Sequence, residues 1–358
     1  MSIQSQHHKL QTLESVRALA ALSVVAFHAS YQSYLHGYAA ECNSILNFGK
    51  HGVQVFFVLS GFIILFIHGK DFGNLEQTPR YFYRRWLRIW PLYAALTLIQ
   101  VVGKPFIPGK DIDSANQIIT SLLFLDLTNT PIITVGWTLI HEAFFYLIFG
   151  FILIFGKRLA AWFGIGFIIC MIAHNFDSSA VNPLVSFTFS HHKWYFLTGI
   201  AVACWVPGRA SASREVSNEQ KKLGFLIFII ILILGIYSII YPMHGKVRPK
   251  TMFLALGIGL ALLGIVRLDL ARTLEMPKIL VYLGAASYSI YLVHSTVLDF
   301  GIIILGKLVP GAMASYLGLI MTILSAFSVI CGVICHEFLE KPLIQYIRKL
   351  RTKRLNTM

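Results

Sequence analysis

The chain has little charge for its length, and few of its charged side chains are negative. Asp and Glu together number 16 among 358 residues and only 13% of all residues are charged, whereas 56% are hydrophobic. A single water-soluble core of this size cannot bury so many apolar side chains. This composition excludes a soluble globular protein and indicates one that crosses the membrane several times.

Cysteine is scarce as well. Four of the five cysteines lie inside apolar runs, and only Cys42 falls in a predicted loop. No two of them have the spacing of a disulfide framework or of a paired metal motif. We therefore expect no bound metal, and the redox compartment stays open.

The apolar runs are close to the length, about 17 to 25 residues, that crosses the hydrocarbon core of a bilayer. The first run is not typical of a cleavable signal peptide, because Arg17 and His28 interrupt it and no small-residue cleavage site follows. The segment 116–128 is shorter and polar at both ends, which predicts an interfacial or re-entrant helix. We predict about ten transmembrane helices, at 14–35, 52–68, 86–103, 136–155, 159–173, 194–206, 223–241, 251–266, 280–306 and 314–335.

The basic residues are unevenly distributed between the predicted loops. With ten spans and a cytoplasmic N-terminus, most of the 30 Lys and Arg residues fall on the cytoplasmic side, as the positive-inside rule requires. We predict an all-α integral membrane protein with both termini in the cytoplasm. It forms a single transmembrane domain over residues 1–358, with spans from about 14 to 343 and a basic cytoplasmic tail at 344–358.

The net charge of +14 raises the alternative of a nucleic-acid partner. The basic residues lie between apolar runs and form no surface interleaved with aromatic residues, so we expect no nucleic acid. The lipid bilayer is the partner that the composition predicts, and the basic tail can lie on its anionic leaflet as an amphipathic helix.

The first predicted span carries two ionisable residues on one face. Arg17 and His28 are eleven residues apart, which in a helix is three turns and a rise of roughly 16 Å. Glu14 can neutralise Arg17 along the same face. Because polar groups inside a bilayer are costly, both residues are candidates for function. The alternative is that Arg17 extends to the interface and His28 makes a helix–helix contact.

Three arginines stand at the start of the third span, in RRWLRIWPLY. Arg85 and Arg88 are three residues apart and share a helical face, and Arg84 lies on an adjacent face. Guanidinium groups fit phosphate oxygens in a bidentate manner. The alternative is that these charges only set the topology, although lysine would satisfy that equally well.

Glu142 lies inside an aromatic span, in GWTLIHEAFFYLIFG, with His141 beside it. Adjacent residues of a helix point about 100° apart, so the two are not expected to form a dyad. Glu142 can orient an imidazole, accept a proton or bind a sugar hydroxyl. The alternative is a protonated or paired structural carboxyl.

Farther along, SYSIYLVHSTV places Ser287, Tyr291 and His294 on one polar stripe, which we interpret as a candidate substrate-binding surface. Interhelical hydrogen bonding is the alternative, and it is common for such residues in membranes. In the closing HEFLEKPL, the residues His336, Glu337, Glu340 and Lys341 predict a surface ion-pair cap.

The order of these motifs resembles the acyltransferase-3 family of integral membrane O-acyltransferases, over about residues 10 to 343. The resemblance rests on VRALAALSVVAFH, FFVLSGFII, RRWLRIWPLY, GWTLIHEAFFY, SYSIYLVH and a closing EKP. It implies a bundle of about ten helices in the bacterial inner membrane. It also implies transfer of an acyl group, usually acetyl, from cytoplasmic acyl-coenzyme A to a hydroxyl of an extracytoplasmic or lipid-linked carbohydrate.

The resemblance assigns roles residue by residue. Arg17 and His28 match the family's functional arginine and histidine, Arg85 and Arg88 match its R-x-x-R pair, and Glu142 matches the glutamate of W-x-L-x-x-E. We hypothesise that His28 is the general base, with Arg17 stabilising charge and Glu142 orienting groups. A competing hypothesis makes His28 a transient acyl carrier. The arginines, Arg84 included, are expected to hold the phosphates of acetyl-coenzyme A.

The chief alternative is a transporter or flippase in which Arg17, His28 and Glu142 line a proton or substrate path. No inverted repeat or paired broken spans support it. The acceptor glycan is not readable from the sequence, since aromatic residues of predicted outside loops, such as Tyr31 and Trp194, are better explained as interfacial anchors than as stacking surfaces for sugars.

Overall fold

The computed structural model describes residues 11–106, 112–127, 131–176, 182–206, 222, 225–227, 229–233, 236, 249–270 and 275–356. All regular elements within these residues are helical, which confirms the predicted all-α fold. The chain divides into two compact units. The first comprises Met1–Leu13, Gln54–Arg85 and His141–Glu275, and the second comprises Glu14–Val53, Trp86–Ile140 and Met276–Met358.

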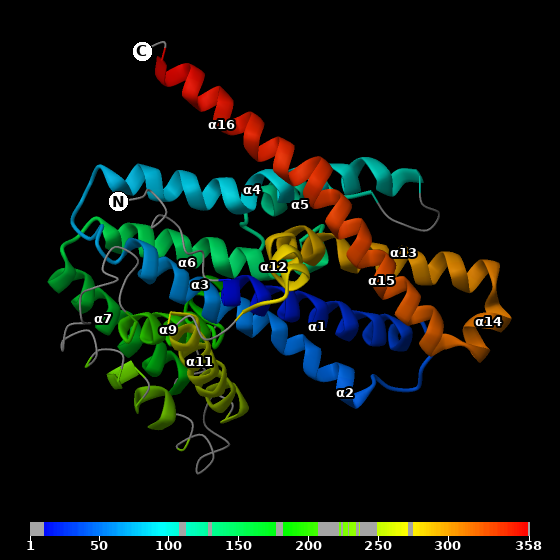
Figure 1. Ribbon diagram of the computed structural model, residues 1–358, viewed down its shortest axis with the longest axis horizontal. Coiled ribbons are helices and arrows are strands. Elements are labelled where there is room, and N and C mark those ends of the chain that lie inside the picture. The colour runs from blue at the N-terminus through cyan, green and yellow to red at the C-terminus, as the bar shows by residue number, and fades with distance from the viewer. Residues whose placement is uncertain are drawn as a thin grey trace. The chain divides into compact units, whose positions relative to one another are not determined.

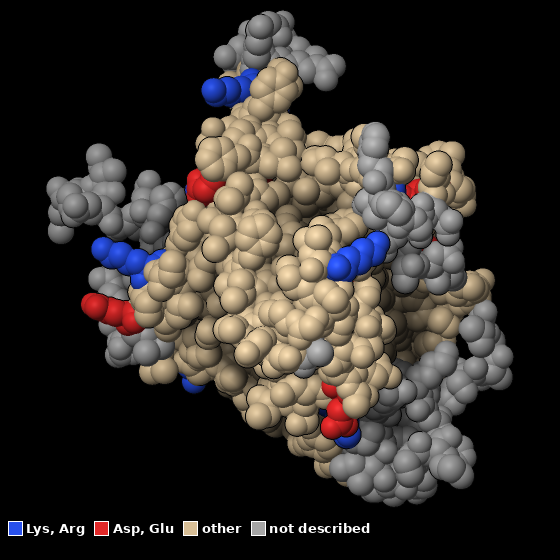
Figure 2. All heavy atoms as spheres, turned by 90° about the vertical axis from the view of Figure 1, so that its right-hand side faces the viewer, with Lys and Arg blue, Asp and Glu red and all other residues tan. Residues whose placement is uncertain are grey.

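Eight helical stretches of the described chain are long and apolar enough to cross a membrane, which confirms a multi-pass membrane protein. Large apolar side chains such as Leu19, Ile99 and Phe151 are exposed, and Figure 2 shows charged side chains scattered sparsely over one face. Much of the predicted span 223–241 lies outside the described residues. The predicted span 194–206 corresponds to α9 (Lys193–Cys204), whose 12 residues fall short of the roughly 20 that a span needs. The number of ten spans and the side of the termini stay predictions.

The first unit is built on close helix contacts. A Cβ atom at Gly61 would lie 2.1 Å from the Phe196 carbonyl oxygen, and one at Gly199 would lie 2.0 Å from that of Val58, so only glycine permits this crossing. Trp194 is buried in the apolar core of the unit, so its expected place in an outside loop is wrong. The helices are α3 (Gly52–His68), the start of α4 (Gln77–Gly103), α6 (Trp137–Leu153), α7 (Lys157–Phe176), α8 (Pro183–Thr188), α9 and α11 (Pro249–Leu270).

The second unit contains a helix of unusual length. In Figure 1, α15 (Leu317–Cys335) runs through a π-helical turn, His336–Glu340, into α16 (Lys341–Asn356) without a visible break. The tail beyond residue 343 therefore continues the last span as a helix. The remaining helices are α1 (Gln11–Leu35), α2 (Ser44–Asn47), the later part of α4, α5 (Ala115–Leu122), α12 (Lys278–Ala285), α13 (Ser287–Leu308) and α14 (Pro310–Ser315), with short 3₁₀ turns at Phe48–His51, Lys104–Phe106 and Thr134–Gly136.

The predicted continuous span 280–306 is wrong, because the chain breaks it at Ala286 into α12 and α13. Ala286 has φ −83° and ψ −4°, so it stays in the right-handed region but its ψ departs by about 40° from the value of a regular α-helix. On the α12 side, a Cβ atom at Gly284 would lie 1.9 Å from the Glu14 carbonyl oxygen. The turn therefore lets α12 pack backbone to backbone on α1 while α13 starts in a new direction at Ser287.

Candidate active site

His28 of α1 lies against His294 of α13 in the second unit. His294 Nδ1 is 2.7 Å from the Tyr291 carbonyl oxygen, and a carbonyl only accepts, so this nitrogen carries the proton. His28 Nδ1 is 3.0 Å from the Val24 carbonyl oxygen and must also be protonated in the neutral ring. It lies 3.2 Å from His294 Nε2, which therefore accepts from it. This pairing leaves His28 Nε2 with its lone pair and no hydrogen-bond partner among the described residues.

The two histidines differ in their exposure. His294 is fully buried, whereas His28 keeps part of its surface exposed. The rings meet edge to face with centroids 4.9 Å apart. The buried histidine thus holds the partly exposed one in place. Sequence reasoning assigned His294 to the substrate, and the pairing with His28 was missed because the two are distant in the chain.

Tyr291 and Ser287 are placed differently from His294. The Tyr291 hydroxyl lies 3.0 Å from Thr138 Oγ1 and 3.4 Å from the Val135 carbonyl oxygen, so it joins α13 to the start of α6. Ser287 is buried at the first position of α13. The interhelical alternative accounts for the Tyr291 contact, and substrate binding by these two side chains stays a prediction.

Arg17 lies three turns before His28 on α1. Its Nη1 is 3.4 Å from Glu14 Oε2, which matches the expected neutralisation along the helix. Glu14 is buried, and Arg17 is partly exposed. The same helix therefore carries a cation that is held by a carboxylate near its start and a base farther along.

Arg85, in the first unit, is surrounded by polar and aromatic groups. Its Nη2 donates to His68 Nε2 at 3.3 Å, and His68 Nδ1 donates to Asp71 Oδ2 at 2.8 Å. Its guanidinium carbon lies 5.4 Å from the ring centroid of Tyr146. Arg85 Nε is buried without a hydrogen-bond partner in the described part of the chain. His68 and Asp71 were missed by sequence reasoning, although H-x-x-D at the end of a span is a visible signal.

Glu142 is linked to the same surroundings. Its Oε1 accepts from Ser60 Oγ at 2.7 Å and from the Tyr146 hydroxyl one turn away. Because the Tyr146 ring faces Arg85, carboxylate and guanidinium share one tyrosine as a neighbour. Glu142 is therefore a hydrogen-bonded carboxyl in a polar cluster, and whether it serves catalysis stays a prediction.

Arg84 and Arg88 precede and follow Arg85 in the sequence of α4, and Arg88 belongs to the second unit. Arg84 is exposed and Arg88 is partly buried. The carbonyl oxygen of Ile89, next to Arg88, accepts from the Tyr288 hydroxyl at 2.5 Å, which fastens the start of α13 to α4 within the second unit. Arg84 can thus meet solvent or a ligand without rearrangement.

The comparisons with known proteins agree with these motifs. The family described as "Acyltransferase domain" matches residues 10–336. The chain belongs to the acyltransferase-3 family. It is 25% identical to the acyltransferase MdmB of Streptomyces mycarofaciens, over 96% of this chain and 94% of that protein. It is 28% identical to the exopolysaccharide production protein ExoZ of Rhizobium meliloti (strain 1021), over 85% and 92%.

A third similar protein is the putative O-acetyltransferase SACOL0978 of Staphylococcus aureus (strain COL), 23% identical over 96% of this chain and 58% of that protein. No solved structure is a significant match. Membership of the acyltransferase-3 family makes the chain a multi-pass membrane O-acyltransferase, and it decides for the enzyme over the transporter alternative.

This acyltransferase-3 protein has two further polar clusters, one around Lys193 and one at the end of α15. His141 and Glu142 have different partners, in line with the expectation that they form no dyad: Glu142 bonds to Ser60 and Tyr146, and His141 Nδ1 lies 2.8 Å from Lys193 Nζ. Lys193 is 2% exposed, and its amine lies over the rings of Phe144 and Phe187. Burial lowers the pKa of the Lys193 amine to about 7.

The predicted surface cap at the end of the last span is wrong for two of its residues. Glu340 and His336 are buried, and Glu340 Oε2 accepts from Ser289 Oγ at 2.6 Å and from His336 Nδ1 at 2.6 Å. The π-helical turn rotates both side chains toward α13. Only Glu337 and Lys341 form the expected pair, at 2.5 Å. Among the described residues, no group of three or more His, Cys, Asp or Glu side chains is placed to hold a metal ion.

Proposed function

We propose that this acyltransferase transfers an acyl group, by preference acetyl, from cytoplasmic acyl-coenzyme A to a hydroxyl of an extracytoplasmic or lipid-linked carbohydrate, in the bacterial inner membrane. The observation that carries the proposal is the lone pair on His28 Nε2, set by the hydrogen bonds of its Nδ1. The names of ExoZ and of the putative O-acetyltransferases support a carbohydrate acceptor and an acetyl group.

His28 is the general base in the proposed reaction. Its Nε2 takes the proton of the acceptor hydroxyl as the oxygen attacks the thioester carbonyl carbon. The new C–O bond forms, the C–S bond breaks, and the coenzyme A thiolate leaves and receives the proton. The imidazolium that forms transiently is stabilised by the Val24 carbonyl and His294 Nε2, since a charged donor strengthens both hydrogen bonds. Arg17 stabilises negative charge that develops on the reacting groups.

The donor is bound through its phosphates. Coenzyme A carries a diphosphate and a ribose phosphate, and Arg84, Arg85 and Arg88 supply guanidinium groups for them. The buried and unpartnered Nε of Arg85 supports this role, because an orphaned donor is costly unless a ligand satisfies it. Glu142, through Tyr146, keeps that part of the protein in place.

The test is transfer of radiolabel from acetyl-coenzyme A to glycan in membranes that contain the protein. We expect His28→Ala to lower kcat by about 10²- to 10⁴-fold, the range for loss of a general base. The matched control is His174→Ala, on α7 of the other unit. Wild-type turnover in folded His28→Ala protein would remove His28 from the mechanism.

The base and the acyl-carrier hypotheses are separated by omitting the acceptor. A carrier accumulates label on His28 when acetyl-coenzyme A is added alone, whereas a general base does not. Mass spectrometry of peptides from the quenched protein therefore decides between them. We expect no labelled His28.

A further inference from the structure

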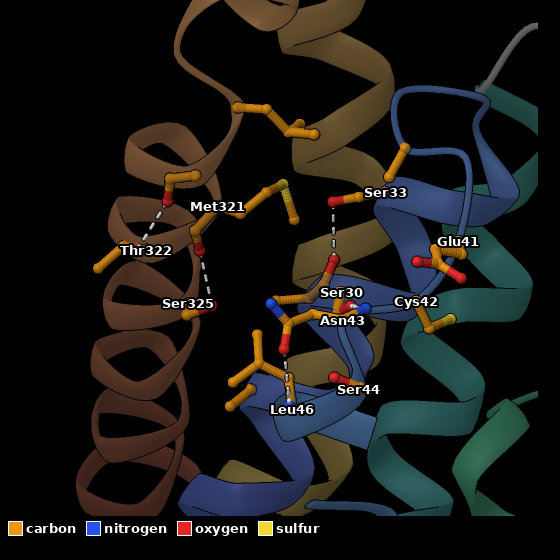
Figure 3. Close-up of a pocket in the computed structure, with 15 residues that line it drawn as sticks. Ser30, Ser33, Glu41, Cys42, Asn43, Ser44, Leu46, Met321, Thr322 and Ser325 are labelled. Atoms are coloured by element: carbon orange, nitrogen blue, oxygen red, sulfur yellow. Dashed lines mark hydrogen bonds between the residues drawn. The ribbon is translucent and has the colours of Figure 1, made fainter. Parts of the chain in front are cut away.

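A cavity of about 620 Å³ lies in the second unit, and neither His28 nor His294 is among its lining residues. Its walls are the outer half of α1, the segment from Ala39 to Leu46, and α15 (Figure 3). This volume is within the range of small-molecule sites, about 300–1,000 Å³. By the predicted topology, the segment 39–46 is on the outside, where the acceptor is expected.

The cavity wall offers hydrogen-bond acceptors on α1 and α15, together with donor groups at the Asn43 amide and the Ser44 hydroxyl. Ser33 Oγ donates to the Ala29 carbonyl oxygen at 2.9 Å, and Thr322 and Ser325 donate to carbonyl oxygens of their own helix at 2.8 and 2.6 Å. Each of these hydroxyls donates its hydrogen to a backbone carbonyl oxygen, so only its oxygen lone pairs are available to a ligand. Glu41 adds a carboxylate, so the complementary ligand carries hydroxyl groups, which both donate to these acceptors and accept from the donors.

The charge of the wall excludes the donor substrate. No Lys or Arg is among the described residues that line the cavity, and Glu41 would repel phosphate or carboxylate groups. Apolar side chains of Leu46 and Met321 complete the lining and suit the C–H faces of a sugar ring. An uncharged polyhydroxyl compound fits this combination, and coenzyme A does not.

The wall is held in shape by the chain itself. The backbone N–H of Asn43 donates to Ser30 Oγ at 2.8 Å, which fixes the loop to α1. Asn43 Oδ1 accepts from the backbone N–H groups of Ile45 and Leu46 at 3.0 and 3.1 Å and so caps α2. Figure 3 shows the bond between Asn43 and Leu46 as a dashed line beside the cavity.

The cavity and the catalytic histidine use different faces of α1. Ala26, Ala29, Ser30 and Ser33 line the cavity, and at about 100° per residue they lie within about 100° of one another. His28 lies roughly 150° from their centre and points to His294. A sugar in the cavity is therefore not the sugar whose hydroxyl meets His28 Nε2.

We propose that this cavity is a subsite for a neutral sugar unit of the acceptor glycan, remote from the unit that is acylated. The inference rests on the proposed function and deepens it, because it makes the acceptor an oligosaccharide or polysaccharide without charge at the bound unit. Long acceptors occupy both places, and short fragments reach only His28.

Filling the cavity tests the subsite. Ser44 lines it on the first residue of α2, and Ile45, which is next to it and 81% exposed, does not. Ser44→Phe is the variant and Ile45→Phe its matched control. The acceptors are surface polysaccharide from host cells that lack this protein, and fragments of one or two sugars made from it by hydrolysis.

For the long acceptor, Ser44→Phe should raise KM about tenfold or more and change kcat less than about twofold. For the fragments, Ser44→Phe and wild type should agree, and Ile45→Phe should behave as wild type with both. An unchanged KM for the long acceptor, or an equal rise for both lengths, overturns the subsite. Absence of transfer by wild-type protein to either acceptor instead rejects the proposed function.

Cys42 supplies a second readout that does not depend on turnover, since it lines the cavity and is partly exposed. In a variant with the other four cysteines replaced by alanine, the long polysaccharide should slow labelling of Cys42 by a maleimide about fivefold or more at saturation. Acetyl-coenzyme A should not slow it. Equal labelling rates with and without polysaccharide overturn the subsite.

Discussion

The two polar clusters of this protein differ in how they treat charge. In the second unit, His28 and His294 are joined by a hydrogen bond, no carboxylate of the described residues bonds to either ring, and His28 Nε2 keeps its lone pair. In the first unit, Arg85, His68 and Asp71 form a charged series that ends in an unpartnered guanidinium N–H. In the proposed function, the first cluster takes a proton and the second binds an anion. The division suits a reaction that needs a base for one substrate and a phosphate anchor for the other.

The largest effect that tests this contrast is expected at His294. His294→Leu removes the acceptor from His28 Nδ1, which frees the ring to change tautomer and rotate. We expect kcat to fall about 10- to 100-fold, while the Kd of coenzyme A stays the same. His294→Gln keeps an acceptor oxygen and should recover part of the loss. A purely structural role would give no recovery with glutamine, and it would move the unfolding temperature together with kcat.

The next effect concerns the anion cluster. Arg85→Ala should raise the Kd of coenzyme A by about tenfold, as loss of one charge-assisted contact of about 1.4 kcal/mol implies. Arg85→Lys should recover little, because a lysine does not reproduce the fork. The measurement is calorimetric binding to protein in detergent, with dephospho-coenzyme A as a second ligand. Unchanged affinity in Arg85→Ala would assign this arginine to topology alone.

A smaller effect, on stability, is expected at the π-helical turn. Glu340→Ala leaves His336 and Ser289 without their shared acceptor, at a cost of about 1–3 kcal/mol for each unsatisfied group. Glu337→Ala, three residues earlier and at the surface, is the matched control and should leave the unfolding temperature unchanged. Equal shifts in the two variants would restore the surface cap that the sequence suggested.

The smallest effect depends on pH. The pKa of Lys193 is lowered to about 7 by burial, so the folded protein binds fewer protons than the unfolded chain between pH 7 and the ordinary lysine value of about 10.4. Stability should therefore rise with pH across that window. Lys193→Met should raise the unfolding temperature by about 2 °C or more at pH 6, with a gain that shrinks toward pH 10. Lys157→Met, at an exposed position, should show no such trend.

The helices and several site residues could be predicted because they depend on local pattern. Apolar length marks the spans, and helical spacing puts Arg17 and His28 on one face. The contacts between distant segments could not be predicted in the same way. His28 and His294 are 266 residues apart, and nothing local in either motif indicates which helix the other will meet.

Glu340 shows a second reason for failure. A glutamate followed by lysine at a membrane edge is typical of a surface pair, and the sequence carries no sign of the π-helical turn that rotates it inward. Ala286 is similar, since alanine does not mark a helix end and the break depends on how closely Gly284 approaches α1. Irregular backbone depends on packing, and packing is absent from a local pattern.

The unbroken run from α15 through the π-helical turn into α16 makes one rod of roughly 60 Å, at 1.5 Å per residue. One end of that rod is a wall of the cavity, and the other carries the basic tail. Because the rod is one continuous helix, a tilt of α15 at the cavity also moves α16. A fluorophore placed on the tail would therefore report a movement of the cavity wall. The basic tail thus reports the orientation of the helix that lines the cavity.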